Sequence, residues 1–180
     1  SWWWSRKTWG KMMRGTLRAD GIKLSLEMTL ISIRTSSSAW DPNARFLKLM
    51  GENRINLPFL CDAARGTSKL GTYCILSEDT PKAKRVIAAD ETLATRLEYL
   101  PYVGSITVFP HNFNLAFIGV ILRLVGQSGA PLYGLATSIS ALTMITDFSR
   151  LEQTAAHLAR HVSLPVNHSP FNPDIRIKSM

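Results

Sequence analysis

The chain has 180 residues, of which 46% are apolar and 19% charged, a composition typical of a folded domain with a core. No apolar run reaches the ~18 residues that a membrane-spanning helix requires, so we predict no membrane span. The net charge is +8, but five basic residues precede the first acid, Asp20, and residues 20–180 carry 16 bases and 13 acids. No basic sheet face with interleaved aromatic residues is evident, so the sequence does not predict nucleic-acid binding.

Residues 1–21 form a basic N-terminal segment with four tryptophans among its first nine residues. Tryptophans beside basic residues are found at membrane interfaces. A disordered or extended segment fits the same composition, and this is the interpretation we prefer. The segment lacks the apolar core and the small-residue cleavage site of a secretory signal peptide.

Residues 22–101 form the first of two predicted units. Asp41 offers a side-chain cap and Pro42 suits a first helical turn, so a helix is expected to begin there. A second helix is expected to run to Pro101, because apolar residues recur at helical spacing through Leu97 and Leu100. The predicted elements are a strand at 28–35, a helix at 42–51, strands at 55–64 and 69–77, and a helix at 80–100.

The same order recurs over residues 102–166. The sequence from Ser149 to Glu152 matches a capping box, in which the serine and glutamate side chains cap the start of a helix reciprocally. Residues 167–180 are expected to form an extended tail. The predicted elements are a strand at 105–109, a helix from 115 to about 126, strands at 132–137 and 140–146, a helix at 151–162 and a short edge strand at 162–166.

Strand, helix, strand, strand, helix, strand is the order of the ferredoxin-like fold, an antiparallel sheet with both helices on one face. We therefore predict an α+β protein with two tandem ferredoxin-like domains. The stretch between Leu100 and Ile106 is too short for a closing and an opening strand, so the first unit is expected to borrow an edge partner. A unit of about 75 residues buries a small core and leaves sheet edges open, so pairing between units and in a homodimer is expected.

Two segments carry a family resemblance. Ser105–Phe109 and Leu132–Asp147 resemble the regulatory ACT domains at the C-terminal end of aspartate kinases. The resemblance covers roughly residues 22–166 and is strongest over 105–147, whereas the order of elements carries it in the first unit. It implies a sensor that binds a small molecule, an amino acid, between paired domains and controls a partner enzyme.

The resemblance implies one ligand site in each unit, between the loop after the first strand and the neighbouring second strand. The family loop usually ends in Pro-Gly, whereas this chain has Pro42-Asn43 and Leu115-Ala116. Helix N-terminal amides still bind anions, so recognition of an amino-acid carboxylate is retained as the prediction. The alternative is a structural or protein-interaction module without a ligand. The candidate contacts are Asn112, Phe113, Asn114, Leu115, Ala136, Thr137 and Ser138 in the second unit, and Ser38, Trp40, Asp41, Cys61 and Asp62 in the first.

No enzyme, metal site or cofactor is predicted. The serines and threonines lack a nucleophile-elbow pattern and an assignable histidine or carboxylate partner. His157 and His161 have the spacing of two metal ligands on a helix, but the sequence shows no third ligand nearby. Cys61 and Cys74 are expected to be free thiols in a reducing cytoplasm, because one pair of cysteines is no disulfide framework.

Overall fold

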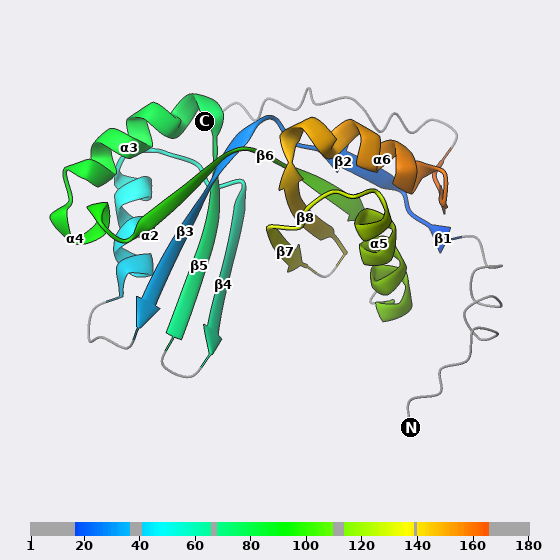
Figure 1. Cartoon of the computed structure of the whole chain (residues 1–180), viewed down its shortest axis with the longest axis horizontal. Coiled ribbons are helices and arrows are strands. Elements are labelled where there is room, and N and C mark those ends of the chain that lie inside the picture. Colours follow the sequence, from blue (N-terminus) through cyan, green and yellow to red (C-terminus); the bar gives the residue numbers. More distant parts are fainter. Residues whose placement is uncertain (1–16, 37–40, 66–67, 110–113, 139, 166–180) are drawn as a thin grey trace.

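The computed structural model describes residues 17–36, 41–65, 68–109, 114–138 and 140–165. One sheet has the strand order β4-β5-β3-β6-β8-β7, and β2 pairs with β6 outside this path. Helices α2, α3 and α4 lie at one end of the molecule and α5 and α6 at the other (Figure 1). The strands are β1 (Leu17–Arg18), β2 (Gly21–Leu24), β3 (Met28–Ser36), β4 (Phe59–Arg65), β5 (Ser68–Leu76), β6 (Leu97–Phe109), β7 (Gly134–Thr137), β8 (Leu142–Asp147) and β9 (Val162–Ser163). The helices are α2 (Pro42–Glu52), α3 (Thr80–Ala88), α4 (Glu91–Ala94), α5 (Leu115–Gln127) and α6 (Leu151–Ala159), with 3-10 turns η1 (Ser77–Asp79) and η2 (Phe148–Arg150).

Strand β6 joins the two units because each half of it belongs to a different part of the sheet. Its first half pairs with β3, whereas its second half pairs with β8 and β2. Between the halves, Leu100 pairs with Leu30 and Val103 with Met28, so Pro101 and Tyr102 form a bulge. Tyr102 there has a φ of 59°, in the left-handed region. The expectation that the first unit borrows an edge partner is therefore wrong, since one long strand serves both units.

The predicted single helix from Thr80 to Pro101 is also wrong in its second half. The side chain of Asp90 accepts hydrogen bonds from the amides of Thr92 (3.1 Å) and Leu93 (3.3 Å) and so starts a separate short helix, α4. Over residues 97–100, and again over residues 104–109, exposure alternates between neighbouring residues, as expected for a strand. Leu97 and Tyr99 pack against the first core, so their apolar character reflects strand burial rather than a helical stripe.

The first core lies between one face of β3 and β5 and the helices α2, α3 and α4. Phe46 of α2 contacts Tyr73 of β5 with ring centroids 4.7 Å apart, and both residues are almost fully buried. The buried members are Ile31, Ile33, Phe46, Leu49, Met50, Ile55, Tyr73, Ile75, Ala83, Ile87 and Leu93.

The second core incorporates the start of the described chain. Ala19 and Ile22 are 2% and 1% exposed and belong to the cluster formed by α5, α6, β6 and β8. The amide of Ala19 donates to the carbonyl of Ser163 (3.1 Å), and β1 pairs in parallel with β9. Ile22 therefore packs in the second unit rather than opening the first, and β9 pairs with β1 instead of forming an edge of the main sheet. Of the predicted N-terminal segment, residues 17–21 are described, with Leu17–Arg18 in β1 and Gly21 at the start of β2. Residues 1–16 and the whole predicted tail, 167–180, lie outside the described residues.

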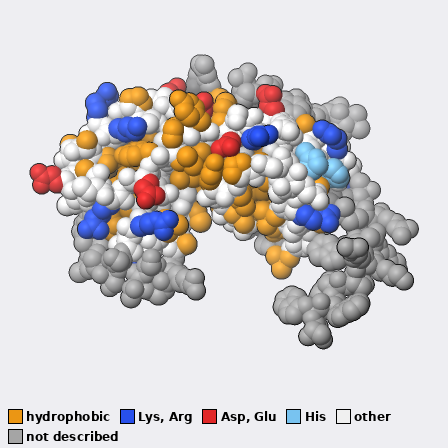
Figure 2. All heavy atoms as spheres, in the orientation of Figure 1, with side chains coloured by type: hydrophobic (Ala, Val, Ile, Leu, Met, Phe, Trp, Pro, Cys, Tyr) orange, Lys and Arg blue, Asp and Glu red, His pale blue; other side chains and the backbone are white. Residues whose placement is uncertain are grey.

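A third cluster joins the two units on the sheet face away from the helices. Phe59 of β4 reaches across to β7, because a Cβ added to Gly134 would lie 3.2 Å from its ring. The buried members are Met28, Leu30, Phe59, Cys74, Val103 and Ile145. Figure 2 shows hydrophobic side chains gathered across the middle of one face of the molecule, between the two groups of helices. Within the described part of the chain, no helix is both long and apolar enough to cross a membrane.

Candidate functional site in the first unit

The N-terminus of α2 lies over the sheet of the first unit and gathers polar side chains there. Asp41 is the N-cap, and its Oδ1 accepts a hydrogen bond from the amide of Asn43 (3.0 Å). Its Oδ2 lies 3.4 Å from Nζ of Lys69 on β5. Partial burial opposes ionisation of Asp41, but the bonds from Asn43 and Lys69 outweigh it and hold the pKa below its ordinary value. Asp41 is therefore a carboxylate at neutral pH.

Asn43 is the unusual residue of this cluster. It is 3% exposed, and neither its Nδ2 nor its Oδ1 has a hydrogen-bond partner among the described residues. The Oγ1 of Thr35, at the end of β3, is buried without a described partner in the same way. Each such atom costs about 1–3 kcal/mol relative to a satisfied one, and folded proteins rarely retain them without a reason.

Two residues of β5 surround the Asn43 carboxamide. A Cβ added to Gly71 would lie 2.3 Å from Oδ1 of Asn43 and 2.5 Å from the hydroxyl of Tyr73. Glycine is therefore required at this position, because a side chain would collide with both polar groups. Burial first, and then the charges of Asp62 and Asp41, raise the pKa of Tyr73 to about 12. The phenol is thus neutral and able to donate a hydrogen bond at neutral pH.

Asp62 of β4 completes the cluster. It pairs in register with Gly71, and its exposed side chain carries a negative charge that acts on Tyr73. The site thus combines acceptors, the carboxylates and the Asn43 oxygen, with donors, the Asn43 amide group, the Tyr73 hydroxyl and the Lys69 ammonium group. Such a mixture can bind a small molecule that has both an anionic and a cationic group.

The residues predicted for this unit have different placements. Asp41 and Asp62 lie in the cluster, whereas Ser38 and Trp40 lie outside the described residues. Cys61 does not face the cluster, because successive residues of a strand point to opposite faces and Cys61 packs against the third hydrophobic cluster. Sequence reasoning missed five contributors, and the available signals were an asparagine in the first helical turn and a glycine within a strand. These contributors are Thr35, Asn43, Lys69, Gly71 and Tyr73.

In the corresponding region of the second unit, the polar side chains of Asn114 and Ser138 have hydrogen-bond partners. Asn114 accepts a hydrogen bond from the amide of Phe117 (3.1 Å) as the N-cap of α5, and Leu115 is 80% exposed. The Ser138 hydroxyl accepts from the amide of Ala141 (3.1 Å), Ala136 packs against the third cluster, and Thr137 is exposed. Asn112 and Phe113 lie outside the described residues. Ala116 occupies the helical position that Asn43 has in the first unit, so this region lacks the buried carboxamide.

The histidines and cysteines form no comparable centre in the described chain. The rings of His157 and His161 have centroids 4.9 Å apart, but no three potential metal ligands gather among the described residues. Cys61 and Cys74 are free thiols. Burial raises the pKa of Cys74 to about 12, so this cysteine is a neutral thiol.

Comparison with known proteins identifies the fold. No protein-family model and no curated protein sequence matches the chain. Among solved structures, the ligand-free regulatory subunit of aspartate kinase from Thermus thermophilus superposes with a TM-score of 0.71 at 12% identity, over 81% of this chain and 99% of that one. The chain has the ACT-type fold of aspartate kinase regulatory domains. The predicted fold class, two tandem ferredoxin-like domains of this type, is thereby confirmed.

Complete aspartate kinases match over a part of their length. The enzyme from Synechocystis has a TM-score of 0.68 at 11% identity, covering 87% of this chain and 29% of that one. Aspartokinase III from E. coli, in complex with lysine and aspartate, has a TM-score of 0.60 at 12% identity, covering 82% of this chain and 34% of that one. The ACT-type fold found here therefore corresponds to about a third of such a kinase.

Proposed function

We propose that this protein is a non-catalytic regulatory module that binds an amino acid at the N-terminus of α2. The observation that carries the proposal is the buried Asn43 carboxamide, whose donor and acceptor both lack a partner in the described structure. A bound α-amino acid offers a partner for each, because its carboxylate accepts and its ammonium group donates hydrogen bonds.

The charges around Asn43 support the same ligand class. The positive end of the α2 dipole and the Lys69 ammonium group favour a carboxylate nearby, and Asp62 favours a nearby ammonium group. The regulatory neighbours, and the E. coli enzyme solved with lysine and aspartate, support an amino acid over other zwitterions. We further propose a homodimer in which paired domains cover the site, with a partner enzyme controlled through that pairing.

A second candidate function applies to the second unit. Asn114 is used as a helix cap and Ala116 replaces the buried asparagine, so the described part of that region has no buried carboxamide without a partner. We propose that this unit is a structural or protein-interaction module, which makes the first unit the sensor.

A thermal-shift screen of the full chain against the twenty amino acids tests the proposal. A ligand present at 100 times its dissociation constant adds about 2.7 kcal/mol to the free energy of unfolding. We expect one amino acid, or a small related group, to raise the melting temperature selectively. Tyr73→Phe should reduce this rise, because it removes only the hydroxyl beside Asn43.

Tyr99→Phe is the matched control, because Tyr99 packs against the same core without belonging to the polar cluster. It should leave the ligand-dependent rise intact. The proposed site would be contradicted if no amino acid raised the melting temperature selectively, or if both variants lost the ligand-dependent rise equally.

A further inference from the structure

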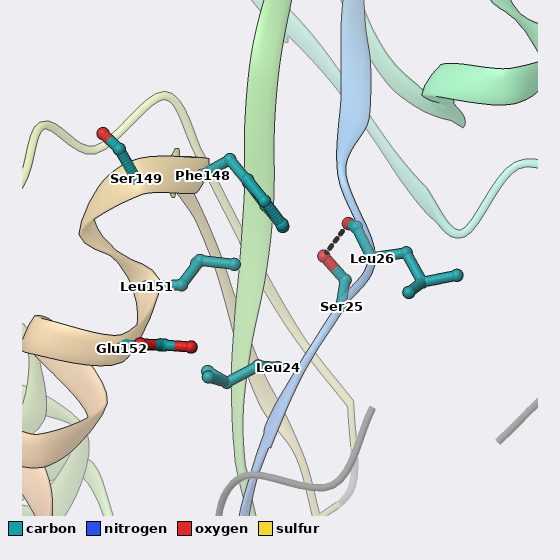
Figure 3. Close-up of a pocket in the computed structure, with 7 residues that line it drawn as sticks. All are labelled: Leu24, Ser25, Leu26, Phe148, Ser149, Leu151 and Glu152. Atoms are coloured by element: carbon teal, nitrogen blue, oxygen red, sulfur yellow. Dashed lines mark hydrogen bonds between the residues drawn. The ribbon is translucent and has the colours of Figure 1, made fainter. Parts of the chain in front are cut away.

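A hollow of about 330 Å³ lies where the chain crosses from β2 to β3. Leu24 lines it from the end of β2, and Phe148 and Leu151 line it from η2 and the first turn of α6. In Figure 3 these side chains converge on the space between α6 and the crossover, and the Glu152 side chain extends toward Leu24. The hollow therefore has apolar walls and a carboxylate beside them.

Contacts with β6 hold the two walls of the hollow in place. The Ser25 hydroxyl accepts a hydrogen bond from the amide of Ser105 (2.8 Å) and donates one to the carbonyl of Leu26 (2.7 Å). On the other side, a Cβ added to Gly104 would lie 2.5 Å from Cδ1 of Leu151. Both the crossover and α6 are thus packed on β6, and the hollow is a feature of the packed fold.

The carboxylate of Glu152 has no role in capping its own helix. The predicted capping box does not form, because η2 precedes α6 and Ser149 makes no cap hydrogen bond; its side chain points away from Glu152 in Figure 3. Arg150, the neighbouring base, donates instead to Gln153 (2.9 Å). Among the described residues Glu152 forms no salt bridge.

We propose that this hollow binds a small molecule with an aliphatic or aromatic body and a single cationic group. The apolar body would cover Leu24, Leu151 and Phe148, which is 37% exposed without such a ligand. The cation would pair with Glu152, and the Phe148 ring adds a favourable face for it. The same carboxylate disfavours an anion. This site is separate from the α2 site and does not depend on the proposed amino-acid binding.

Titration of the full chain with three six-carbon probes, followed by amide chemical shifts in NMR spectra, tests this inference. The probes are n-hexylammonium, hexanol and hexanoate, which share the chain and differ in charge. We expect shifts at Leu24, Ser25 and Leu151, strongest affinity for hexylammonium and weakest for hexanoate. Phe148→Ala should weaken both hexylammonium and hexanol, because both bury the same apolar wall.

Glu152→Gln tests the carboxylate charge separately from the apolar walls, because it removes the charge and keeps the shape of the side chain. It should weaken hexylammonium binding by up to about fivefold, the upper end of the range for a partly exposed ion pair, and leave hexanol binding unchanged. Glu91→Gln, which changes a first-turn carboxylate of another helix, should alter neither probe. Equal affinities for hexylammonium and hexanoate, an unchanged hexylammonium affinity in Glu152→Gln, or shifts located elsewhere would overturn the proposal.

Discussion

At the scale of single residues, Asn43 places ligand binding and stability in conflict. Its buried carboxamide lacks a described partner, so an apolar side chain of similar shape should suit the ligand-free fold at least as well. We expect Asn43→Leu to leave the free energy of unfolding unchanged or to raise it by about 1 kcal/mol, while abolishing the amino-acid-dependent shift. Chemical denaturation with and without the amino acid measures both effects.

Asn53→Leu is the control at the other end of α2. Asn53 donates from its side chain to the carbonyl of Leu49 (2.9 Å), so its replacement should lower stability by about 0.5–1.5 kcal/mol and spare the ligand response. A strong loss of stability in Asn43→Leu would show that its carboxamide has a structural partner and would remove the main support for the site.

Asp41 could be predicted from sequence because capping is a local pattern. Asn43 could not, because burial of its carboxamide depends on Gly71 and Tyr73, which come from a distant strand.

At the scale of elements, the start of α4 depends on Asp90. The hydrogen bond from the Thr92 hydroxyl first, and then the Arg45 guanidinium 2.7 Å away, hold the pKa of Asp90 below its ordinary value of 3.8. Because the folded-state pKa is the lower one, this stabilisation is complete above the unfolded-state pKa and is lost as the pH falls through the folded-state pKa. We expect Asp90→Asn to lower the melting temperature at pH 7 and to flatten its decline below about pH 4. Melting curves between pH 7 and pH 2 measure this, and Asp79→Asn, next to α3, should keep the wild-type profile.

The same region shows which elements local patterns could predict. The helix caps at Asp41 and the strand at 28–35 follow from adjacent residues and are observed. Leu97 and Leu100 fit a helical stripe equally well on periodicity, and their true place in β6 is decided by pairing with β3. Periodicity over a few apolar residues cannot distinguish these outcomes without knowledge of the partner strand.

At the scale of the whole molecule, sequence order and spatial order differ. The sequence predicted two consecutive units, and the ACT-type resemblance rests on Ser105–Phe109 and Leu132–Asp147 in the second unit and on the order of elements in the first. The return of β2 to the second unit was missed, because strand pairing over more than 80 residues leaves no local signal: Ile22 pairs with Val108. The first unit is therefore enclosed in the sequence by strands that belong to the second.

This enclosure predicts which helices are destabilised by a mutation near the start of the described chain. Ile22→Ala removes side-chain atoms from a residue that is 1% exposed in the second core, and should cost about 2–5 kcal/mol. We expect native-state hydrogen exchange to accelerate mainly in α5 and α6, although Ile22 is closer in sequence to α2. Ile55→Ala, at a 4% exposed position of the first core, should accelerate exchange mainly in α2 and α3. If both variants instead accelerate exchange of the same amides, the third cluster couples the two units into one cooperative fold. The effect of ligand binding at α2 would then be transmitted through the packed sheet rather than through β6 alone.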